Sequence, residues 1–187
     1  MRLFIERGFD DVTTTEIASS SGVSTATLFN YFATKEDLFF GEVERLEDAL
    51  HELVAACRPG ESILQALQGH VLYELTAGRA DSKPSAVEPF HRAVVESPRL
   101  QAREAQIYQR REAVLARALA SALGLQPDDT TARVAAAQYV AAERVIADEL
   151  RARLASGAPT ATFEEMQPFI ATVFGILAEG VGDLPRN

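Results

Sequence analysis

Hydrophobic residues recur at spacings of three and four along most of the chain, which is the period of an amphipathic helix rather than of a strand. Alanine, the strongest helix former, is abundant throughout the sequence. The pattern therefore predicts an all-α protein. The expected helices are short ones at 2–7, 14–21 and 25–31, followed by longer ones at about 35–57, 61–78, 84–95, 98–123, 128–155 and 163–180.

Polar residues with helix-capping chemistry stand at the starts of several of these helices. In a capping box, a Ser or Thr side chain accepts a hydrogen bond from the backbone three residues later, and an acidic side chain at that position returns the bond. The required spacing occurs at Thr13 with Glu16, Thr34 with Asp37, and Thr162 with Glu165. Ser97 followed by Pro98 indicates another helix start, because proline at the first helical position loses no hydrogen bond.

Residues 14–31 have the pattern of a helix-turn-helix. Two helices that cross steeply over a short turn need a small residue at their contact, a turn residue that tolerates positive φ, and apolar anchors. Ala18, Gly22 and Leu28 meet these needs. In such a motif the second helix enters the DNA major groove. Its outward positions here are Thr25, Ala26, Thr27, Asn30 and Tyr31. The pattern alone leaves open an ordinary helical hairpin inside an all-α core.

Four linked stretches near the N-terminus resemble the N-terminal domain of the tetracycline-repressor (TetR) family. They are LFIERGF at 3–9, TTTEIA at 13–18, GVSTATLFNYF at 22–32 and KEDL at 35–38. The rest of the chain matches that family only in helix number and length. The resemblance implies a helix-turn-helix domain at 1–34, with its first helix truncated, and a helical ligand-binding and dimerisation domain at 35–187.

The resemblance also implies which residues contact a double-stranded DNA operator. By position they are Thr14 and Thr15 at the start of the first motif helix, Thr25, Ala26 and Thr27 at the start of the recognition helix, Asn30 and Tyr31 at its end, and Lys35, which would reach a phosphate. Threonine suits this task, because its methyl can contact a thymine methyl and its hydroxyl can bond a base edge. Phe29 stands where the family often has tyrosine, so a phosphate hydrogen bond is lost unless Tyr31 supplies it.

The charge of the chain argues against a broad DNA-binding surface. The formal net charge is −9, whereas DNA affinity depends on clustered cations that release counterions. Residues 1–35 hold three basic residues, Arg2, Arg7 and Lys35, against four acidic ones. Any DNA contact must therefore be local, and we expect the natural protein to begin upstream of Met1.

The sequence offers no pattern of catalytic residues or metal ligands. His51, His70 and His91 lie on different expected helices, and neither HExxH, a phosphate-binding glycine loop nor GxSxG occurs. The single cysteine, Cys57, fits a reducing compartment. No apolar run approaches the roughly 20 residues that span a bilayer. We therefore expect a cytoplasmic protein that is not an enzyme, needs no cofactor or metal, and has no membrane partner.

The helices between 46 and 123 exceed what a dimer interface needs and could enclose a small molecule. Such sites usually combine apolar walls with a few polar groups, so a mostly apolar ligand is expected. The expected pocket residues are His70, Tyr73, Phe90, His91, Arg92, Ile107, Tyr108 and Arg111. The candidates for holding an acidic ligand are Arg92, Arg110 and Arg111. The alternative is that these residues simply fill a core.

Two features near the C-terminus point to a partner helix. The last expected helix carries an apolar stripe wide enough to bury on two sides, and the helix before it is rich in alanine, which permits close approach. The expected dimer-interface residues are Val134, Ala141, Val145, Phe169, Ile170, Val173, Phe174 and Leu177. The resemblance implies a four-helix bundle between two chains. The alternative, burial within one subunit, accounts for part of the stripe.

Together these features predict a ligand-responsive DNA-binding transcriptional regulator. The resemblance implies a homodimeric repressor, and two-fold symmetry would match a near-palindromic operator. A small, mostly apolar molecule would release it, with the helix beginning at Lys35 as the lever. The competing hypothesis is an all-helical binding or scaffold protein without DNA affinity, which the acidic charge favours.

Overall fold

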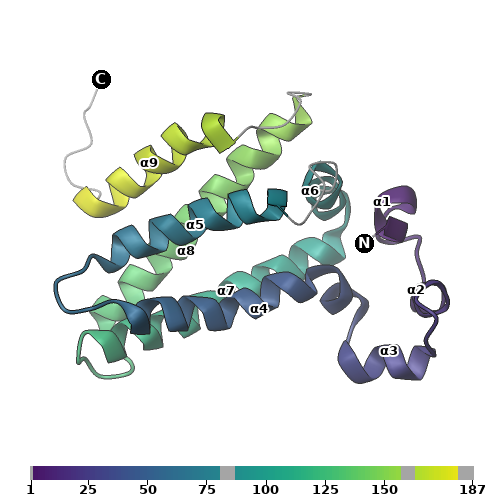
Figure 1. Cartoon of the computed structure of the whole chain (residues 1–187), viewed down its shortest axis with the longest axis horizontal. Coiled ribbons are helices and arrows are strands. Elements are labelled where there is room, and N and C mark those ends of the chain that lie inside the picture. The colour runs from purple at the N-terminus through teal and green to yellow at the C-terminus, as the bar shows by residue number, and fades with distance from the viewer. Residues whose placement is uncertain (1, 81–86, 157–162, 181–187) are drawn as a thin grey trace.

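The computed structural model describes residues 2–80, 87–156 and 163–180, and the side chains of all of these except 42–48, 75–80, 87–88 and 163–164. Its helices are α1 (Arg2–Arg7), α2 (Thr14–Ser20), α3 (Thr25–Tyr31), α4 (Lys35–Ala56), α5 (Ile63–Ala80), α6 (Val87–Glu96), α7 (Pro98–Ala122), α8 (Thr130–Ala155) and α9 (Phe163–Glu179) (Figure 1). The described residues contain no strand. The all-α prediction is confirmed.

Local capping explains why the predicted helix starts agree with the structure. The Thr13 hydroxyl accepts from the Glu16 amide at 3.3 Å, and the Glu16 carboxylate accepts from the Thr13 amide at 2.8 Å. Thr34 and Asp37 form the same reciprocal pair at 3.1 and 2.9 Å. Ser97 caps α7 with Pro98 in its first turn. The third predicted capping box includes Thr162, which lies outside the described residues, so it stays a prediction.

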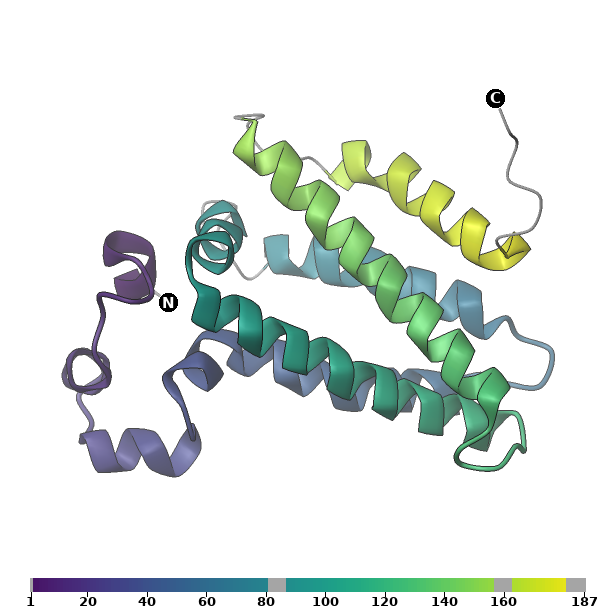
Figure 2. The same cartoon turned by 180° about the vertical axis from the view of Figure 1, so that it is seen from behind.

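The helices form two parts: a smaller head, made of α1, α2 and α3, and a body, made of the helices from α4 onward. In Figures 1 and 2, α1, α2 and α3 lie together at one end, and α4 leads from them into the body. There α7 packs against both α4 and α8, while α9 contacts both α5 and α8. The main core lies among these helices and includes Leu50, Leu67, Leu115, Ile146 and Ile170.

A second hydrophobic cluster joins the head to the body. We call Phe4, Phe9, Phe39, Phe40 and Phe90 the junction cluster. Phe39 stacks on Phe90 with ring centroids 4.7 Å apart, and it meets the edges of Phe4 at 5.7 Å and Phe9 at 5.6 Å. Because the head, α4 and α6 share these contacts, hydrophobic packing continues across residue 34. The division into two domains at that position stays a prediction.

No helix among the described residues is both long enough and apolar enough to cross a membrane.

Candidate nucleic-acid interface

The helix-turn-helix expected at residues 14–31 is present. α2 and α3 pack against each other, with Ala18 and Leu28 buried on their inner faces. Gly22 takes a φ of 68°, a left-handed conformation that glycine adopts without steric cost. The Val23 amide then donates to the Ala18 carbonyl at 3.0 Å, which closes the turn. These contacts hold α3 across α2 with its other face toward solvent.

The outward face of α3 carries small polar and aromatic side chains. Ala26 and Asn30 are exposed, Tyr31 is 80% exposed and Phe29 is 45% exposed. Thr25 is half-buried at the first turn. Such a surface offers methyl groups, an amide and aromatic rings to a DNA groove, and no charge. At the start of α2, Thr15 is exposed and Thr14 is half-buried.

Thr27 has its hydroxyl committed within the protein. Its oxygen lies 2.8 Å from the hydroxyl oxygen of Ser24, whose side chain also accepts from the Thr27 amide at 3.0 Å. This pairing completes the N-cap of α3. The γ-methyl of Thr27 is therefore the group better suited to contact a base.

Lys35 makes contacts that the sequence did not indicate. Its ammonium donates to the carbonyl oxygens of Phe9 at 2.7 Å and Val12 at 2.9 Å, and it lies 4.2 Å from the centroid of the Phe9 ring. Desolvation lowers the pKa of Lys35. Because these carbonyls lie in the loop between α1 and α2, the hydrogen bonds of Lys35 connect the head to the start of α4. A phosphate contact by Lys35 stays a prediction.

Another head cation is also engaged internally. Arg7 pairs with Glu16 at 2.6 Å and donates to the Asp11 carbonyl at 3.0 Å. The Thr13 amide, then the Arg7 side chain, lower the pKa of Glu16 to about 2. The charges of Arg7 and Lys35 are therefore both engaged by groups of the protein itself.

The first turn of α4 connects the head to the body through Asp37. One carboxylate oxygen caps the Thr34 amide at 2.9 Å, and the other pairs with Arg103 of α7 at 2.7 Å. Lys35 and Asp37 thus link this one helical turn to the α1–α2 loop and to α7. A displacement of α7 relative to α4 would act directly on the first turn of α4, the helix that follows α3 in the chain.

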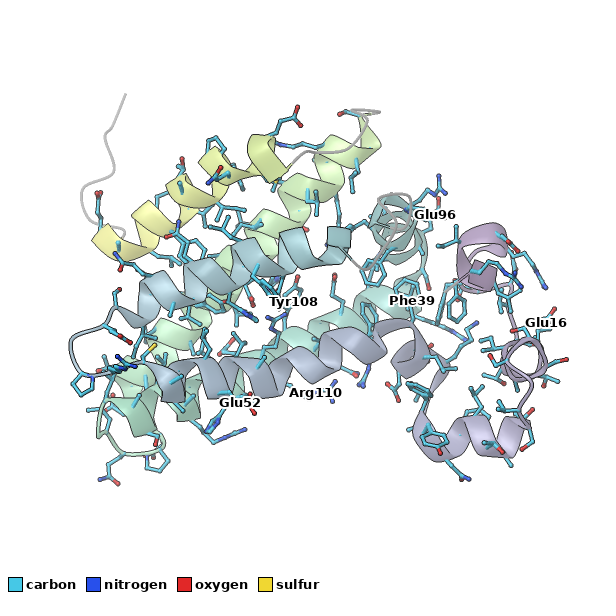
Figure 3. The ribbon with its side chains drawn as sticks, viewed as in Figure 1. Glu16, Phe39, Glu52, Glu96, Tyr108 and Arg110 are labelled. Atoms are coloured by element: carbon cyan, nitrogen blue, oxygen red, sulfur yellow. The ribbon has the colours of Figure 1, made fainter. Side chains whose placement is uncertain are left out.

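Part of the expected pocket forms a charged cluster inside the body. Arg111 pairs with Glu143 at 2.9 Å, and the same nitrogen lies 3.5 Å from Glu74. His70 lies 2.9 Å from the same Glu74 oxygen. Arg111 is therefore occupied by two carboxylates, which corrects its assignment as a group for holding an acidic ligand. Arg110, the next residue, is exposed on α7 (Figure 3).

The other expected pocket residues are distributed over several places. Phe90 and Ile107 pack in the hydrophobic cluster between head and body. His91 contacts Phe90, and burial, followed by the charge of Arg151, lowers its pKa to about 4. Tyr108 packs against the main core. Tyr73 and Arg92 are exposed on the surface, so the structure corrects their placement in the lining of an internal pocket.

Comparison with known proteins identifies the head. Residues 1–41 match the model of the bacterial regulatory proteins, tetR family. The chain is 31% identical over 112 residues to "Nucleoid occlusion factor SlmA" of Pasteurella multocida, covering 59% of this chain and 56% of the relative. It is 29% identical over 154 residues to "HTH-type transcriptional regulator TcmR" of Streptomyces glaucescens, covering 80% and 68%.

The match to the tetR family covers the head and the start of α4. A second SlmA, from Cronobacter sakazakii, is 29% identical over 168 residues, covering 88% of this chain and 84% of that protein. The chain nevertheless spans little more than half the length of the first relative. The family resemblance read from the four N-terminal stretches is confirmed.

The expected dimer residues of this chain divide into two groups. Ile170 and Phe174 are 0% and 3% exposed, because they face α5 and α8 of the same chain. Their assignment to an interface is therefore wrong. Phe169, Val173 and Leu177 are partly buried against the same core. Val134 and Val145 are each 50% exposed, and Ala141 between them is also exposed.

Among the residues whose side chains are described, no group of three or more His, Cys, Asp or Glu could hold a metal ion. The Cys57 thiol donates to the Leu53 carbonyl at 3.4 Å near the end of α4.

Proposed function

We propose that this chain is a homodimeric, ligand-responsive transcriptional regulator that acts as a repressor at a near-palindromic operator. The observation that carries the proposal is the helix-turn-helix with its uncharged outward face on α3, within a segment that matches the tetR family. A single recognition helix contacts only a few base pairs, whereas a two-fold dimer doubles the site. A small molecule in the body would shift the head through α4.

The first experiment measures DNA binding directly. Fluorescence anisotropy with duplexes covering the DNA that flanks the gene, in the presence of excess unrelated duplex, should give saturable binding to one segment. The affinity for this segment should fall as the salt concentration rises, because binding releases counterions from the DNA and added salt makes that release less favourable. Absence of binding to every duplex would favour the competing function, an all-helical binding or scaffold protein without DNA affinity, to which the net charge of −9 is better suited. Binding of equal strength to every duplex would refute a specific operator.

The α8 face supports the dimer. Val134, Ala141 and Val145 recur at spacings of seven and four, so they lie along one exposed stripe of the helix. An exposed apolar stripe of this length is typical of an interface between helices.

Replacing Val145 by glutamate should separate the dimer. A charge buried without a partner costs several kcal/mol, and a loss of about 3 kcal/mol weakens association by roughly 100-fold. Analytical ultracentrifugation at micromolar concentration should therefore show a dimer for the unmodified protein and a monomer for the variant. Val95→Glu is the matched control, since Val95 is a valine of similar exposure on α6. Dissociation by both substitutions, or by neither, would exclude this α8 stripe as the interface.

Thr27 allows a sharp test of how bases are contacted. Because its hydroxyl is paired with Ser24, we expect its methyl to contact a thymine methyl. Thr27→Ser removes only the methyl and should cost about 1 kcal/mol at one base pair of the operator. Thr27→Val keeps a methyl there and should bind more tightly than Thr27→Ser. Affinities for operators substituted one base pair at a time measure this, and the reverse order of the two variants would assign the contact to the hydroxyl.

A further inference from the structure

The centre of the outward face of α3 is set by the one residue that the helix buries. Leu28 is buried, and α3 packs against α2. Successive residues of a helix are rotated by roughly 100°, so the positions opposite Leu28 are Ala26 and Asn30. Both are exposed. In Figures 1 and 2 no other described helix covers the outer side of α3. Ala26 and Asn30 therefore form the centre of this face, with Thr27 and Phe29 beside them.

This face carries no cation that could bind guanine. Glu16 is the only charged residue between Thr14 and Thr34. The basic residues on either side of that segment are Arg7, which pairs with Glu16 at 2.6 Å, and Lys35, which donates to carbonyl oxygens of the α1–α2 loop. Guanine presents two acceptors, O6 and N7, in the major groove, and arginine or lysine commonly donates to both. The outward face of α3 offers neither side chain.

Asn30 has a side chain whose hydrogen-bonding groups match adenine. Its carboxamide offers an acceptor oxygen and an amino group that donates, and within the described part of the chain it makes no hydrogen bond. Adenine presents the N7 acceptor and the N6 donor side by side, so one carboxamide can bond both. Guanine has an acceptor in place of that donor, so one of the two bonds would be lost. Asn30 therefore favours adenine over guanine.

The other groups near the centre of the face are methyl groups. Ala26 ends in a methyl, and the Thr27 hydroxyl is held by Ser24 at 2.8 Å, which leaves the Thr27 methyl for an outside contact. Thymine is the base that presents a methyl group in the major groove. Residues four apart on a helix lie about 5–6 Å from each other, and base pairs stack about 3.4 Å apart. Ala26 and Asn30 would therefore reach base pairs within about two steps of each other.

We propose that α3 recognises adenine–thymine base pairs. Asn30 would bind N6 and N7 of an adenine, and the methyl groups of Ala26 and Thr27 would contact thymine methyls within about two base pairs of it. Each half of the operator would then contain a short adenine–thymine segment, and no guanine would be recognised through O6 or N7. This inference rests on the proposed function, because it requires α3 to enter the major groove, and it adds which bases are recognised there.

Base analogues test the assignment without changing the protein. The probe is the duplex from the flanking DNA that the unmodified chain binds most tightly, altered at one position at a time, and affinity is measured by fluorescence anisotropy at fixed salt. Deoxyuridine in place of thymidine removes one methyl and should weaken binding about fourfold at a contacted position. 7-Deazaadenine removes N7 and should weaken it about fivefold. 7-Deazaguanine should cause no measurable loss at any position.

The pattern of losses decides the outcome. The proposal requires losses with both deoxyuridine and 7-deazaadenine in each half of the site, at positions within about two base pairs of each other. Absence of either loss, or a loss with 7-deazaguanine, would overturn it.

A variant connects the adenine contact to Asn30. Asn30→Ala removes the carboxamide, so the loss caused by 7-deazaadenine should disappear while the loss caused by deoxyuridine remains. Gln109→Ala is the matched control, since Gln109 is an exposed amide on α7, and it should retain both losses. Each loss is a ratio of affinities within one variant, so a general weakening of binding does not affect it. A 7-deazaadenine loss that persists in Asn30→Ala would overturn the role of Asn30. The analogue series decides the base preference even if Asn30→Ala does not fold.

This proposal and the proposed function can fail separately. Absence of specific binding to any duplex would refute both, because no base would then be recognised. Specific binding without the expected analogue pattern would refute only the adenine–thymine assignment and would leave the proposed function standing.

Discussion

Replacing Arg111 by methionine is expected to lower the free energy of unfolding by about 3–5 kcal/mol near pH 8. The substitution preserves an apolar stem but leaves the buried Glu143 and the half-buried Glu74 without their shared cation. Breaking a buried pair is costly because the remaining charge loses both its partner and its access to water. Urea unfolding at a fixed protein concentration measures the loss.

The loss of unfolding free energy in Arg111→Met should be smaller at low pH than at high pH. The pKa of Glu143 is raised to about 7 in the folded protein, so between its ordinary value and 7 the folded state binds more protons than the unfolded state. The contribution of this group to stability is therefore present at low pH and is lost as the pH rises through 7. The Arg111→Met variant should be destabilised less near about pH 5.5 than near about pH 8.

Arg110→Met is the control for this prediction. Arg110 is the neighbouring arginine on α7 but is exposed, and surface substitutions usually change stability by about 0.5 kcal/mol or less. Equal losses in the two variants, or a loss that does not change with pH, would show that the buried carboxylates are not the cause.

Phe39→Ala is expected to destabilise the chain by about 3–5 kcal/mol, the range for truncating a buried aromatic ring. Phe39 is buried and contacts Phe4 and Phe9 of the head, Phe40 beside it on α4, and Phe90 of α6. Removing its ring leaves a cavity at the place where head and body meet. Because the typical total stability of a domain is about 5–15 kcal/mol, this is a large fraction.

Urea unfolding followed by circular dichroism measures the effect of Phe39→Ala. Phe29→Ala is the matched control, since Phe29 is a phenylalanine of the head that is 45% exposed. It should change stability little while altering the outward face of α3. Hydrogen exchange adds a regional readout: amides of α1 and α2 should lose protection in Phe39→Ala before those of α8. Unchanged protection in the head would mean that the junction cluster does not hold it.

The helices and the helix-turn-helix were predictable from the sequence because their determinants are local. Capping by Thr13 and Thr34 depends on bonds to residues three positions away, and the turn depends on Gly22 and its immediate neighbours. Such interactions depend on residue identity and spacing, which the sequence displays directly. The exposed side of α3 follows in the same way, since the buried positions of a short helix leave only one other face.

The tertiary structure alone decided which charges pair and which faces are covered. Lys35 reaches carbonyls at Phe9 and Val12, more than 20 residues earlier, and Arg111 meets Glu143 32 positions later on another helix. Nothing in the local pattern distinguishes these side chains from exposed ones.

The stripe on α9 illustrates the same limit. Its apolar residues at spacings of three and four predicted burial, but they did not say against what. Packing of α9 on α5 and α8 places Ile170 and Phe174 in the core of the chain, while Val134 and Val145 of α8 stay exposed. Periodicity determines that a helix has an apolar face, whereas the neighbour that covers this face depends on how all the helices pack.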